Sequence, residues 1–469
     1  MELIGRKFER EILRKAYESK QPEFIAIYGR RRVGKTYLVR EYFKDRFTLY
    51  VTGLANANKS QQIVNFHNGI VNIDESRSAN PIPSNWLGVF DELSSTLEKM
   101  GKSKEKKVIF IDEAPFMDTP KSDFITALEH FWNAWAAGRD DILLIICGSA
   151  SSWIVNKVIK NHGGLHNRLT YKIRLLPFTL AETKEFLESK NVRWVNKSIA
   201  ECYMIMGGLP YYLNYIDPKY SLAQNIDIIF LNDNALLRGE FDNLFASLFK
   251  KSEPFARIIE ILSKKKSGFY RSDIVKGMGL KDGGSLTGKL TALEECGFIR
   301  KYRPVQGKAE VYQLIDFFCL FHFSFIKNNL YDADAWKLIT NTPKYNTWCG
   351  LSFEKLCLTH AQQIRNALGI KGVGTRTYSY YSKETQIDMV IERDDNVVNM
   401  CEMKYSREPY TITKNEAEKL EKRASTLRKI FGSRKNIYIT MVTLSGLERN
   451  EYANSIVQDS VTLDDIIGA

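Results

Sequence analysis

Three continuous apolar runs stand out in the first third of the chain, at residues 24–28, 108–111 and 142–147. Strands that are buried on both faces give such continuous runs, whereas half-exposed strands alternate with polar residues. Residues 47–52 are rich in β-branched and aromatic side chains and indicate a further strand. The pattern predicts an α/β domain with a parallel sheet, preceded by an amphipathic helix within residues 2–20.

The segment after the first run, residues 29–36, is framed by glycines and ends in Gly-Lys-Thr. This spacing fits the G-x-x-x-x-G-K-[ST] pattern of a P-loop, whose backbone N–H groups cradle phosphate at the start of a helix. We expect Lys35 to reach the β- and γ-phosphates of ATP and the Thr36 hydroxyl to bind Mg²⁺. A basic surface turn is the simpler alternative. The remaining predicted nucleotide-binding residues of the loop are Gly29, Arg30, Arg31, Arg32, Val33 and Gly34.

The second apolar run ends in two carboxylates, Asp112 and Glu113, about 75 residues after the P-loop. Carboxyl ends of parallel strands open into the ligand crevice of such sheets. We therefore expect Asp112 to bind the nucleotide and its Mg²⁺, and Glu113 to polarise the attacking water.

Two further polar residues are placed near the same edge of the predicted sheet. Ser149 follows the third run and is predicted to sense the γ-phosphate, unless it only caps the next helix. Arg168 is predicted to stabilise the charge of the transition state, with an ordinary surface arginine as the alternative.

The pattern becomes helical over residues 178–249, which we expect to form a lid. Residues 250–315 read as three short helices followed by two strands, the order of a winged helix-turn-helix. Residues 250–310 hold 14 Lys or Arg against 7 Asp or Glu, a net charge of +7. This charge favours DNA contact by Ser285, Thr287 and Lys289, although winged helices also dock proteins.

An aromatic-rich linker over residues 316–344 leads to a second α/β domain over residues 345–469. Glu354 lies on a predicted helix, whereas Asp388 and the Glu402-x-Lys404 pair lie on two strands of a predicted hairpin. Clustered carboxylates favour a divalent cation between them, so Glu354, Asp388 and Glu402 are predicted ligands of Mg²⁺ or Mn²⁺. Glu402 and Lys404 are the predicted catalytic pair. The alternative is a solvated Glu-x-Lys on an edge strand.

Composition narrows the class of protein. The net charge of +12 favours an acidic partner, with nucleic acid ahead of anionic lipid. No apolar run approaches the ~18 residues of a membrane span, and the first residues lack a signal-peptide pattern. The seven scattered cysteines contain no C-x-x-C pair, so we expect buried thiols in a reducing cytoplasm.

The motifs of residues 1–245 together resemble the archaeal-type ATPase family of the AAA-like signal-transduction (STAND) NTPases. They are Gly-Arg-Arg-Arg-Val-Gly-Lys-Thr, Ile-Asp-Glu-Ala, the Leu-Leu-Pro-Phe after Arg168, and Gly-Gly-Leu-Pro at residues 207–210. The resemblance implies an ATPase core over residues 1–177 with a helical lid. It also implies that Pro210 approaches the nucleotide base, although such a turn is also simply a turn.

The C-terminal constellation resembles the PD-(D/E)xK nuclease core, and the domain of unknown function that often follows archaeal-type ATPase modules. Ile387 stands where the name-giving motif has proline. The resemblance implies an ATP- and Mg²⁺-dependent switch that controls a nuclease-like domain acting on nucleic acid, with DNA the expected partner and a homo-oligomer left open. The alternative is an ATP-dependent DNA-binding regulator or signalling ATPase with a catalytically silent nuclease fold.

Overall fold

The chain forms two compact units. Residues 1–177 with 290–296 make up the first, and residues 178–289 with 297–469 make up the second. Across the described ranges, every helix is too short or too polar to cross a lipid bilayer. The computed structural model describes residues 3–149, 153–160, 163–165, 167–249, 251–279, 281–303, 309–327, 335–340, 342–381 and 385–469.

Five parallel strands form the sheet of the first unit, in the order β2-β3-β4-β1-β5. Every residue of β3 and β4 is buried, which is why both strands read as continuous apolar sequence. The predicted parallel sheet is confirmed, and β5 adds an edge strand that the apolar pattern did not indicate. The strands are β1 (Glu23–Tyr28), β2 (Phe47–Thr52), β3 (Lys107–Asp112), β4 (Ile142–Gly148) and β5 (Tyr171–Arg174).

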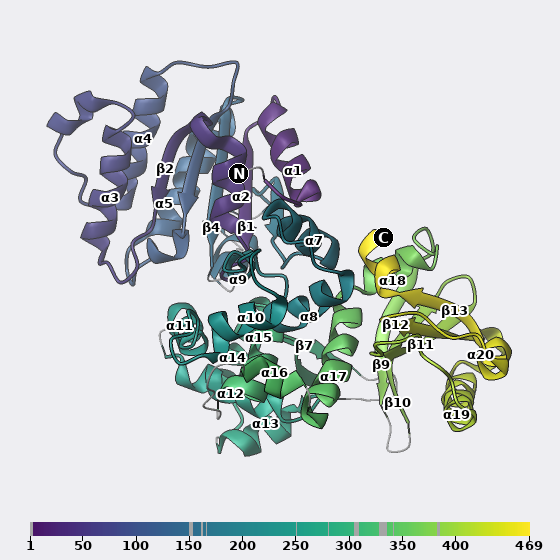
Figure 1. The fold of residues 1–469 in the computed structure, drawn as a ribbon. Coiled ribbons are helices and arrows are strands. Elements are labelled where there is room, and N and C mark those ends of the chain that lie inside the picture. The colour runs from purple at the N-terminus through teal and green to yellow at the C-terminus, as the bar shows by residue number, and fades with distance from the viewer. Residues whose placement is uncertain are drawn as a thin grey trace. The chain divides into compact units, whose positions relative to one another are not determined.

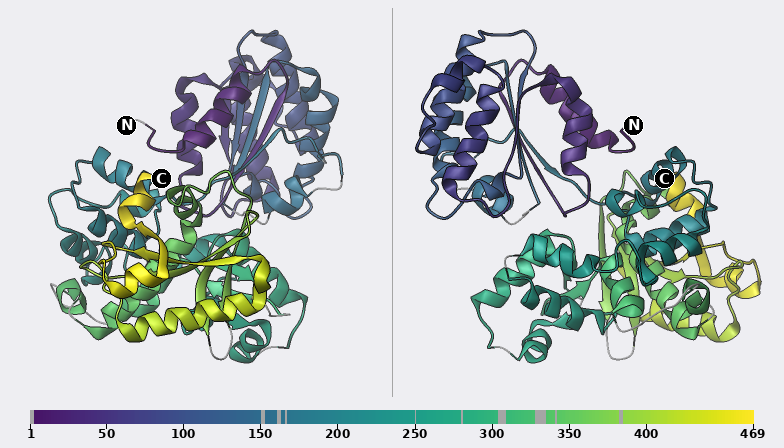
Figure 2. Two further views of the ribbon diagram at one scale, coloured as in Figure 1. Left: turned by 90° about the vertical axis from the view of Figure 1, so that its right-hand side faces the viewer. Right: turned by 60° about the vertical axis from the view of Figure 1, so that its left-hand side comes forward.

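Helices cover both faces of this sheet (Figure 2). Helices α3, α4 and α5 enclose the larger core with one face of the strands, and α1 and α2 lie against the other face. The predicted N-terminal helix is present over a shorter range. The helices are α1 (Lys7–Glu18), α2 (Lys35–Phe43), α3 (Lys59–Val71), α4 (Trp86–Lys99) and α5 (Phe124–Ala134), with short turns η1 (Lys44–Arg46), η2 (Glu75–Ala79), η3 (Ala114–Phe116), η4 (Ala136–Gly138) and η5 (Ile154–Ile159).

The second unit begins with the helical segment that the sequence predicts (Figure 1). It then continues into three helices, the last of which ends in residues of the first unit, and a small antiparallel sheet of order β6-β8-β7. These elements are α7 (Leu180–Ser189), α8 (Asn196–Met206), α9 (Pro210–Leu213), α10 (Leu222–Ile226), η6 (Asp227–Leu231), α11 (Glu240–Leu248), α12 (Glu253–Ser263), β6 (Phe269–Tyr270), α13 (Arg271–Met278), α14 (Gly284–Glu295), β7 (Ile299–Tyr302) and β8 (Val311–Leu314).

A mixed five-stranded sheet of order β13-β12-β11-β10-β9 forms the C-terminal part of this unit. Strands β9, β10 and β11 pair antiparallel, whereas β11, β12 and β13 pair parallel. Helix α19 packs its apolar side on one face of the sheet. The elements are α15 (Phe317–Phe321), η7 (His322–Ile326), α16 (Ala335–Thr340), α17 (Pro343–Thr359), α18 (Ala361–Ala367), β9 (Thr375–Tyr381), β10 (Gln386–Arg393), β11 (Val397–Lys404), α19 (Lys414–Phe431), η8 (Gly432–Arg434), β12 (Asn436–Thr443), α20 (Glu451–Ile456), β13 (Val457–Thr462) and α21 (Leu463–Gly468).

Candidate nucleotide site and C-terminal carboxylate cluster

The loop between β1 and α2 needs both of its glycines. The backbone of Gly29 has φ of +146°, and a Cβ built there would lie 2.3 Å from the carbonyl oxygen of Leu175. Gly34 has φ of +88° and forms the N-cap of α2. Side chains at these positions would strain or block the turn, so the glycine frame of the motif has a local steric cause.

Lys35 lies folded over this loop. Its Nζ donates to the carbonyl oxygens of Gly29 and Arg30, each at 3.0 Å, and the residue is only 6% exposed. The ammonium group is thereby held at the N-terminal end of α2, where free backbone N–H groups favour an anion. Arg30 and Val33 are buried, whereas Arg31 and Arg32 are half-buried.

Thr36 and Asp112 meet at the ends of α2 and β3. The Thr36 hydroxyl is 2.9 Å from Oδ2 and 3.2 Å from Oδ1 of the Asp112 carboxylate. Burial raises the pKa of Asp112, and the hydrogen bond from Thr36 opposes that rise. A buried carboxylate beside a hydroxyl is an oxygen donor set that suits Mg²⁺, so the residues present fit the predicted ion.

Glu113 is held by the neighbouring strand. The backbone N–H and the hydroxyl of Ser149 both donate to Oε2 of Glu113, at 3.1 and 2.9 Å. The N–H of Glu113 donates to Oδ1 of Asp112 at 3.0 Å, and its backbone is left-handed with φ of +45°. The adjacent carboxylates therefore have different partners: Asp112 contacts Thr36, whereas Glu113 contacts Ser149.

Arg6 is a residue of this site that the sequence reasoning missed. Its Nη2 donates to the carbonyl oxygen of Val33 at 3.0 Å, and its Nη1 donates to that of Leu176 at 2.6 Å. The buried guanidinium therefore fastens the P-loop to the segment after β5. No local motif marks it, because both contacts are with residues far away in the sequence.

Two predicted nucleotide-site residues come from other segments of the chain. Arg168 lies exposed in a turn before β5, where its backbone N–H donates to Leu165 at 3.1 Å. Pro210 is the first residue of α9 and belongs to the second unit. The roles predicted for both residues stay predictions.

The C-terminal hairpin brings Asp388 and Glu402 to neighbouring strands. Met389 of β10 pairs with Cys401 of β11, and the same antiparallel register places Asp388 opposite Glu402. Glu354 comes from α17. Burial, followed by the charge of Asp388, raises the pKa of Glu354 to about 7, and Glu402 adds to the rise. The three predicted carboxylates therefore share one neighbourhood.

Each of these carboxylates is nevertheless paired with a basic side chain. Lys266 forms an ion pair with Glu354, and its Nζ lies 3.8 Å from Oδ1 of Asp388. Glu402 pairs with Lys404 at 3.0 Å and with Arg423 of α19 at 2.5 Å. Among the described residues, no three His, Cys, Asp or Glu side chains form a group that could hold a metal ion. In this arrangement the carboxylates do not fit the predicted metal site.

The basic side chains that accompany Glu402 line a small hollow beside it. The hollow encloses about 190 Å³. Three cationic side chains and two carboxylates line it, and Glu402 pairs with two of the cations. It is lined by Glu402, Lys404, Tyr410, Glu416, Lys419, Leu420 and Arg423.

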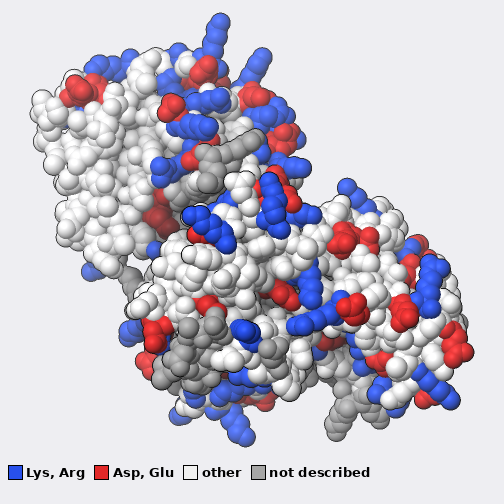
Figure 3. Space-filling model, in the orientation of Figure 1, with Lys and Arg blue, Asp and Glu red and all other residues white. Residues whose placement is uncertain are grey.

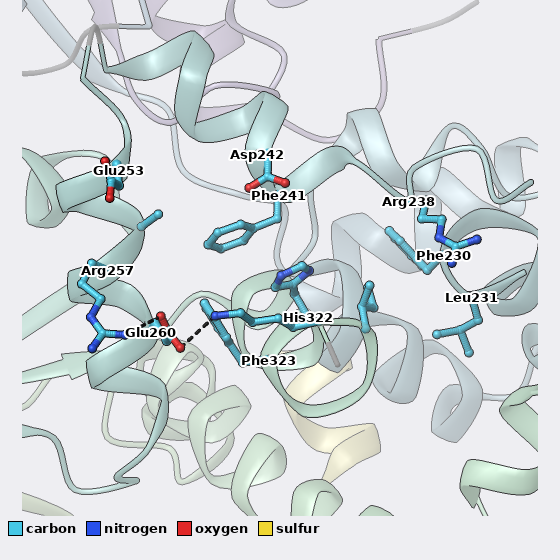
Figure 4. Close-up of a pocket in the computed structure, with 13 residues that line it drawn as sticks. Phe230, Leu231, Arg238, Phe241, Asp242, Glu253, Arg257, Glu260, His322 and Phe323 are labelled. Atoms are coloured by element: carbon cyan, nitrogen blue, oxygen red, sulfur yellow. Dashed lines mark hydrogen bonds and ion pairs between the residues drawn. The ribbon is translucent and has the colours of Figure 1, made fainter. Parts of the chain in front are cut away.

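A larger pocket of about 620 Å³ lies among the helices of the second unit (Figure 4). Its floor is aromatic, and the His322 ring stacks on Phe241 with ring centroids 4.3 Å apart. Burial and the nearby charge of Lys327 lower the pKa of His322 to about 4. Glu260 binds both Arg257, at 3.0 Å, and Lys327, at 2.8 Å, at the edge of the pocket. His322 is thus a buried ring of the pocket.

Two family models match separate parts of the chain. Residues 3–216 match the model of an ATPase domain predominantly from Archaea, and residues 322–420 match that of archaeal and bacterial proteins of unknown function. The chain is similar to an uncharacterized protein of Methanocaldococcus jannaschii, with 23% identity over 399 residues, 84% of this chain and 85% of the other.

One solved structure shares the fold over about two thirds of the chain. The chain is similar to a Walker-type ATPase of Pyrococcus abyssi, with a TM-score of 0.50, 16% identity, and coverage of 68% of this chain and 96% of that one. A STAND protein of Pyrococcus horikoshii with a tetratricopeptide repeat sensor matches with a TM-score of 0.32 and 18% identity, over 79% of this chain and 50% of that one. The N-terminal part of the chain is thus similar to the predominantly archaeal ATPase domain, and a C-terminal part is similar to the archaeal and bacterial proteins of unknown function.

Proposed function

We propose that the chain binds ATP with Mg²⁺, hydrolyses it, and uses this turnover as a STAND-type switch for its C-terminal domain. The ATPase part of this proposal is supported by the position of its residues on the parallel sheet. The P-loop lysine, the Thr36–Asp112 pair and the Ser149–Glu113 pair all lie at the carboxyl ends of neighbouring parallel strands. This is the edge at which open α/β sheets bind ligands.

Each residue of the site has a distinct task in this proposal. Lys35 exchanges its two loop carbonyls for phosphate oxygens, and the N–H groups at the start of α2 bind the same charge. Thr36 and Asp112 hold Mg²⁺, which supplies positive charge to the phosphates when bound. Glu113, positioned by Ser149, orients the attacking water and accepts its proton. Arg168 adds positive charge during phosphoryl transfer, from the same subunit or from a neighbour.

Two substitutions separate binding from hydrolysis. Lys35→Ala should abolish binding of a fluorescent ATP analogue, because a major phosphate contact is lost. Glu113→Gln should retain binding and lower turnover by at least about 100-fold, as for loss of a general base. Lys15→Ala, which changes an exposed lysine of α1, should leave both unchanged. Normal turnover in Glu113→Gln would contradict the assigned role of this glutamate.

The proposed effector is the region after the lid. Residues 250–315 contain the order of helices and strands expected of a winged helix, and Lys and Arg side chains gather around α13 (Figure 3). Ser285 and Thr287 are exposed on α14, whereas Lys289 is half-buried and donates to the Ser285 hydroxyl. We propose that this region binds DNA and that the mixed-sheet domain acts on it with Mg²⁺ or Mn²⁺.

A cleavage assay tests the nuclease part of this proposal. Plasmid and single-stranded DNA are incubated with Mg²⁺ or Mn²⁺, with and without ATP, beside an Asp388→Ala variant. Cleavage that disappears in the variant identifies the C-terminal domain as an ATP-governed nuclease.

A second function is favoured by the cation pairing of Glu354, Asp388 and Glu402. Carboxylates that are neutralised by Lys and Arg support a DNA-binding or signalling ATPase with a silent nuclease fold. This function predicts salt-sensitive DNA binding without cleavage in any nucleotide state. A Lys264→Glu/Lys265→Glu variant should weaken binding if the region contacts DNA, and should leave it unchanged if the region docks protein.

A further inference from the structure

The turn between α12 and β6 reaches the C-terminal carboxylates. It carries three consecutive lysines, of which Lys264 and Lys265 are exposed and Lys266 is turned inward. The side chains of Lys266, Glu354 and Asp388 are only 26%, 16% and 15% exposed. An ion pair at this depth is less weakened by solvent than the neighbouring surface charges.

The backbone of this turn is fixed by the small sheet. The carbonyl oxygen of Lys266 accepts a hydrogen bond from Nε2 of Gln313 at 2.7 Å, and that of Ser267 accepts one from the Tyr302 hydroxyl at 2.7 Å. Gly268 has φ of +83°, and a Cβ there would lie 2.3 Å from the carbonyl oxygen of Tyr312. Lys266 is therefore presented by a constrained turn and is not simply a long side chain on a loose surface.

The Glu354 and Asp388 carboxylates have room for either the Lys266 ammonium group or a metal ion between them, but not for both. The ammonium group of Lys266 occupies the position between Glu354 and Asp388 at which a divalent cation would neutralise the same carboxylates. A divalent ion beside the ammonium group would face direct repulsion in a partly desolvated setting. Metal and lysine are thus alternatives for one pair of carboxylates.

We infer that Lys266 is a built-in counter-cation of the Glu354–Asp388 pair, and that its ammonium group excludes a divalent cation from these two carboxylates. The role of Lys266 rests on the metal chemistry proposed above for the same carboxylates. The contact between the turn and α17 therefore keeps a cation of the protein's own at the position of the proposed metal ion.

Binding of Mn²⁺ to the full chain without nucleotide tests this inference directly. The number of bound ions per chain is counted from the loss of the electron paramagnetic resonance signal of free Mn²⁺. Lys266→Met removes the charge at nearly constant length and should add one bound Mn²⁺ relative to wild type. The added ion should disappear in Lys266→Met/Asp388→Asn. Lys266→Arg and the exposed-site control Lys264→Met should match wild type.

The outcomes separate failure of the lysine role from failure of the metal site. If wild type already binds a Mn²⁺ that Asp388→Asn removes, the carboxylates form a metal site and Lys266 does not exclude the ion. If Lys266→Met gains no ion, both the exclusion by Lys266 and the proposed metal site are overturned. The comparison of wild type with Asp388→Asn decides against exclusion even if Lys266→Met fails to fold.

Discussion

Ser149 fixes the position of the Glu113 carboxylate, which we propose as the general base. Its hydroxyl and backbone N–H both donate to the same oxygen of Glu113. The hydroxyl is the part that a substitution can remove. Its hydrogen bond to a carboxylate is expected to contribute about 1.5–3 kcal/mol.

We therefore expect Ser149→Ala to lower ATP turnover by roughly 10- to 100-fold, because about 1.4 kcal/mol corresponds to a factor of ten. Nucleotide affinity should change little, since Ser149 acts on Glu113. Steady-state turnover and equilibrium binding are measured side by side. Ser95→Ala, which removes an exposed hydroxyl bonded to its own helix, provides the control. Unchanged turnover would show that Glu113 needs no hydroxyl support.

Two histidines of the second unit, His322 and His360, are buried. In His360, Nδ1–H donates to the carbonyl oxygen of Leu356 at 2.8 Å, and Nε2 accepts the N–H of Leu180 at 2.9 Å. A proton on Nε2 would destroy the second bond. Burial lowers the pKa of His360, as it does that of His322, to about 4. As pH falls below about 6.5, the unfolded chain takes up protons that the folded chain refuses, so stability is lost toward pH 4.

The expected loss is on the order of 3 kcal/mol per histidine across this interval, at about 1.4 kcal/mol per pH unit. In His322→Phe the ring can still stack on residue Phe241. The variant should take up one proton fewer than wild type on unfolding in this pH range. His130→Gln changes an exposed ring and should keep the full dependence. Urea unfolding between pH 7 and pH 4.5 measures the difference. The hypothesis fails if His322→Phe has the wild-type slope.

At the scale of elements, the sequence predicts the buried strands better than the edge strands. Strands β3 and β4 are buried at every position, so their apolar runs are unambiguous. Strand β5 has only four residues and exposes Lys172 and Arg174. Strand β13 carries Gln458, Asp459 and Ser460 in sequence. Edge strands are hidden from a hydrophobic pattern because few of their side chains are buried.

Site residues could be predicted where the whole motif is contiguous in the sequence, and could not where the contacts join distant residues. The P-loop is recognisable because its spacing, glycines and following helix are contiguous. Arg6 and Lys266 were missed because their partners lie far along the chain, at Val33 and Glu354. Residue type and spacing predict the carboxylates of the C-terminal hairpin, but only the folded chain shows which cations reach them.

The constrained turn before β6 gives a prediction about an element. Gly268→Ala should strain the turn by roughly 1–3 kcal/mol and force it away from Tyr312. Lys266 would then no longer reach Glu354 and Asp388. Gly268→Ala should therefore bind the same additional Mn²⁺ that is expected of Lys266→Met. Gly279→Ala is the matched control, because φ is +64° but no atom lies within 4 Å of the added Cβ. Equal Mn²⁺ uptake by both variants would mean that strain alone opens the site.

At the scale of the whole molecule, the two compact units should respond differently to nucleotide. Most residues of the proposed ATP site belong to the first unit, whereas Pro210 belongs to the second. Mg²⁺-ATP at 100 times its dissociation constant should raise the free energy of unfolding of the first unit by about 2.7 kcal/mol. Calorimetry should show this as a higher transition temperature for that unit. Lys35→Ala should remove this effect. A simultaneous rise in the second transition would indicate that the lid engages the nucleotide, and no rise in either would contradict the binding site.

All seven cysteines are free and buried, and burial raises the pKa of Cys147 well above that of an exposed thiol. Because the thiolate is the reactive form, alkylating reagents can modify these residues only when the surrounding structure opens. Cys147 and Cys296 fall in the first unit, and the other five fall in the second. Pulsed alkylation read by mass spectrometry would therefore give the rate at which each unit opens. The native cysteines of each unit report this rate without any added label.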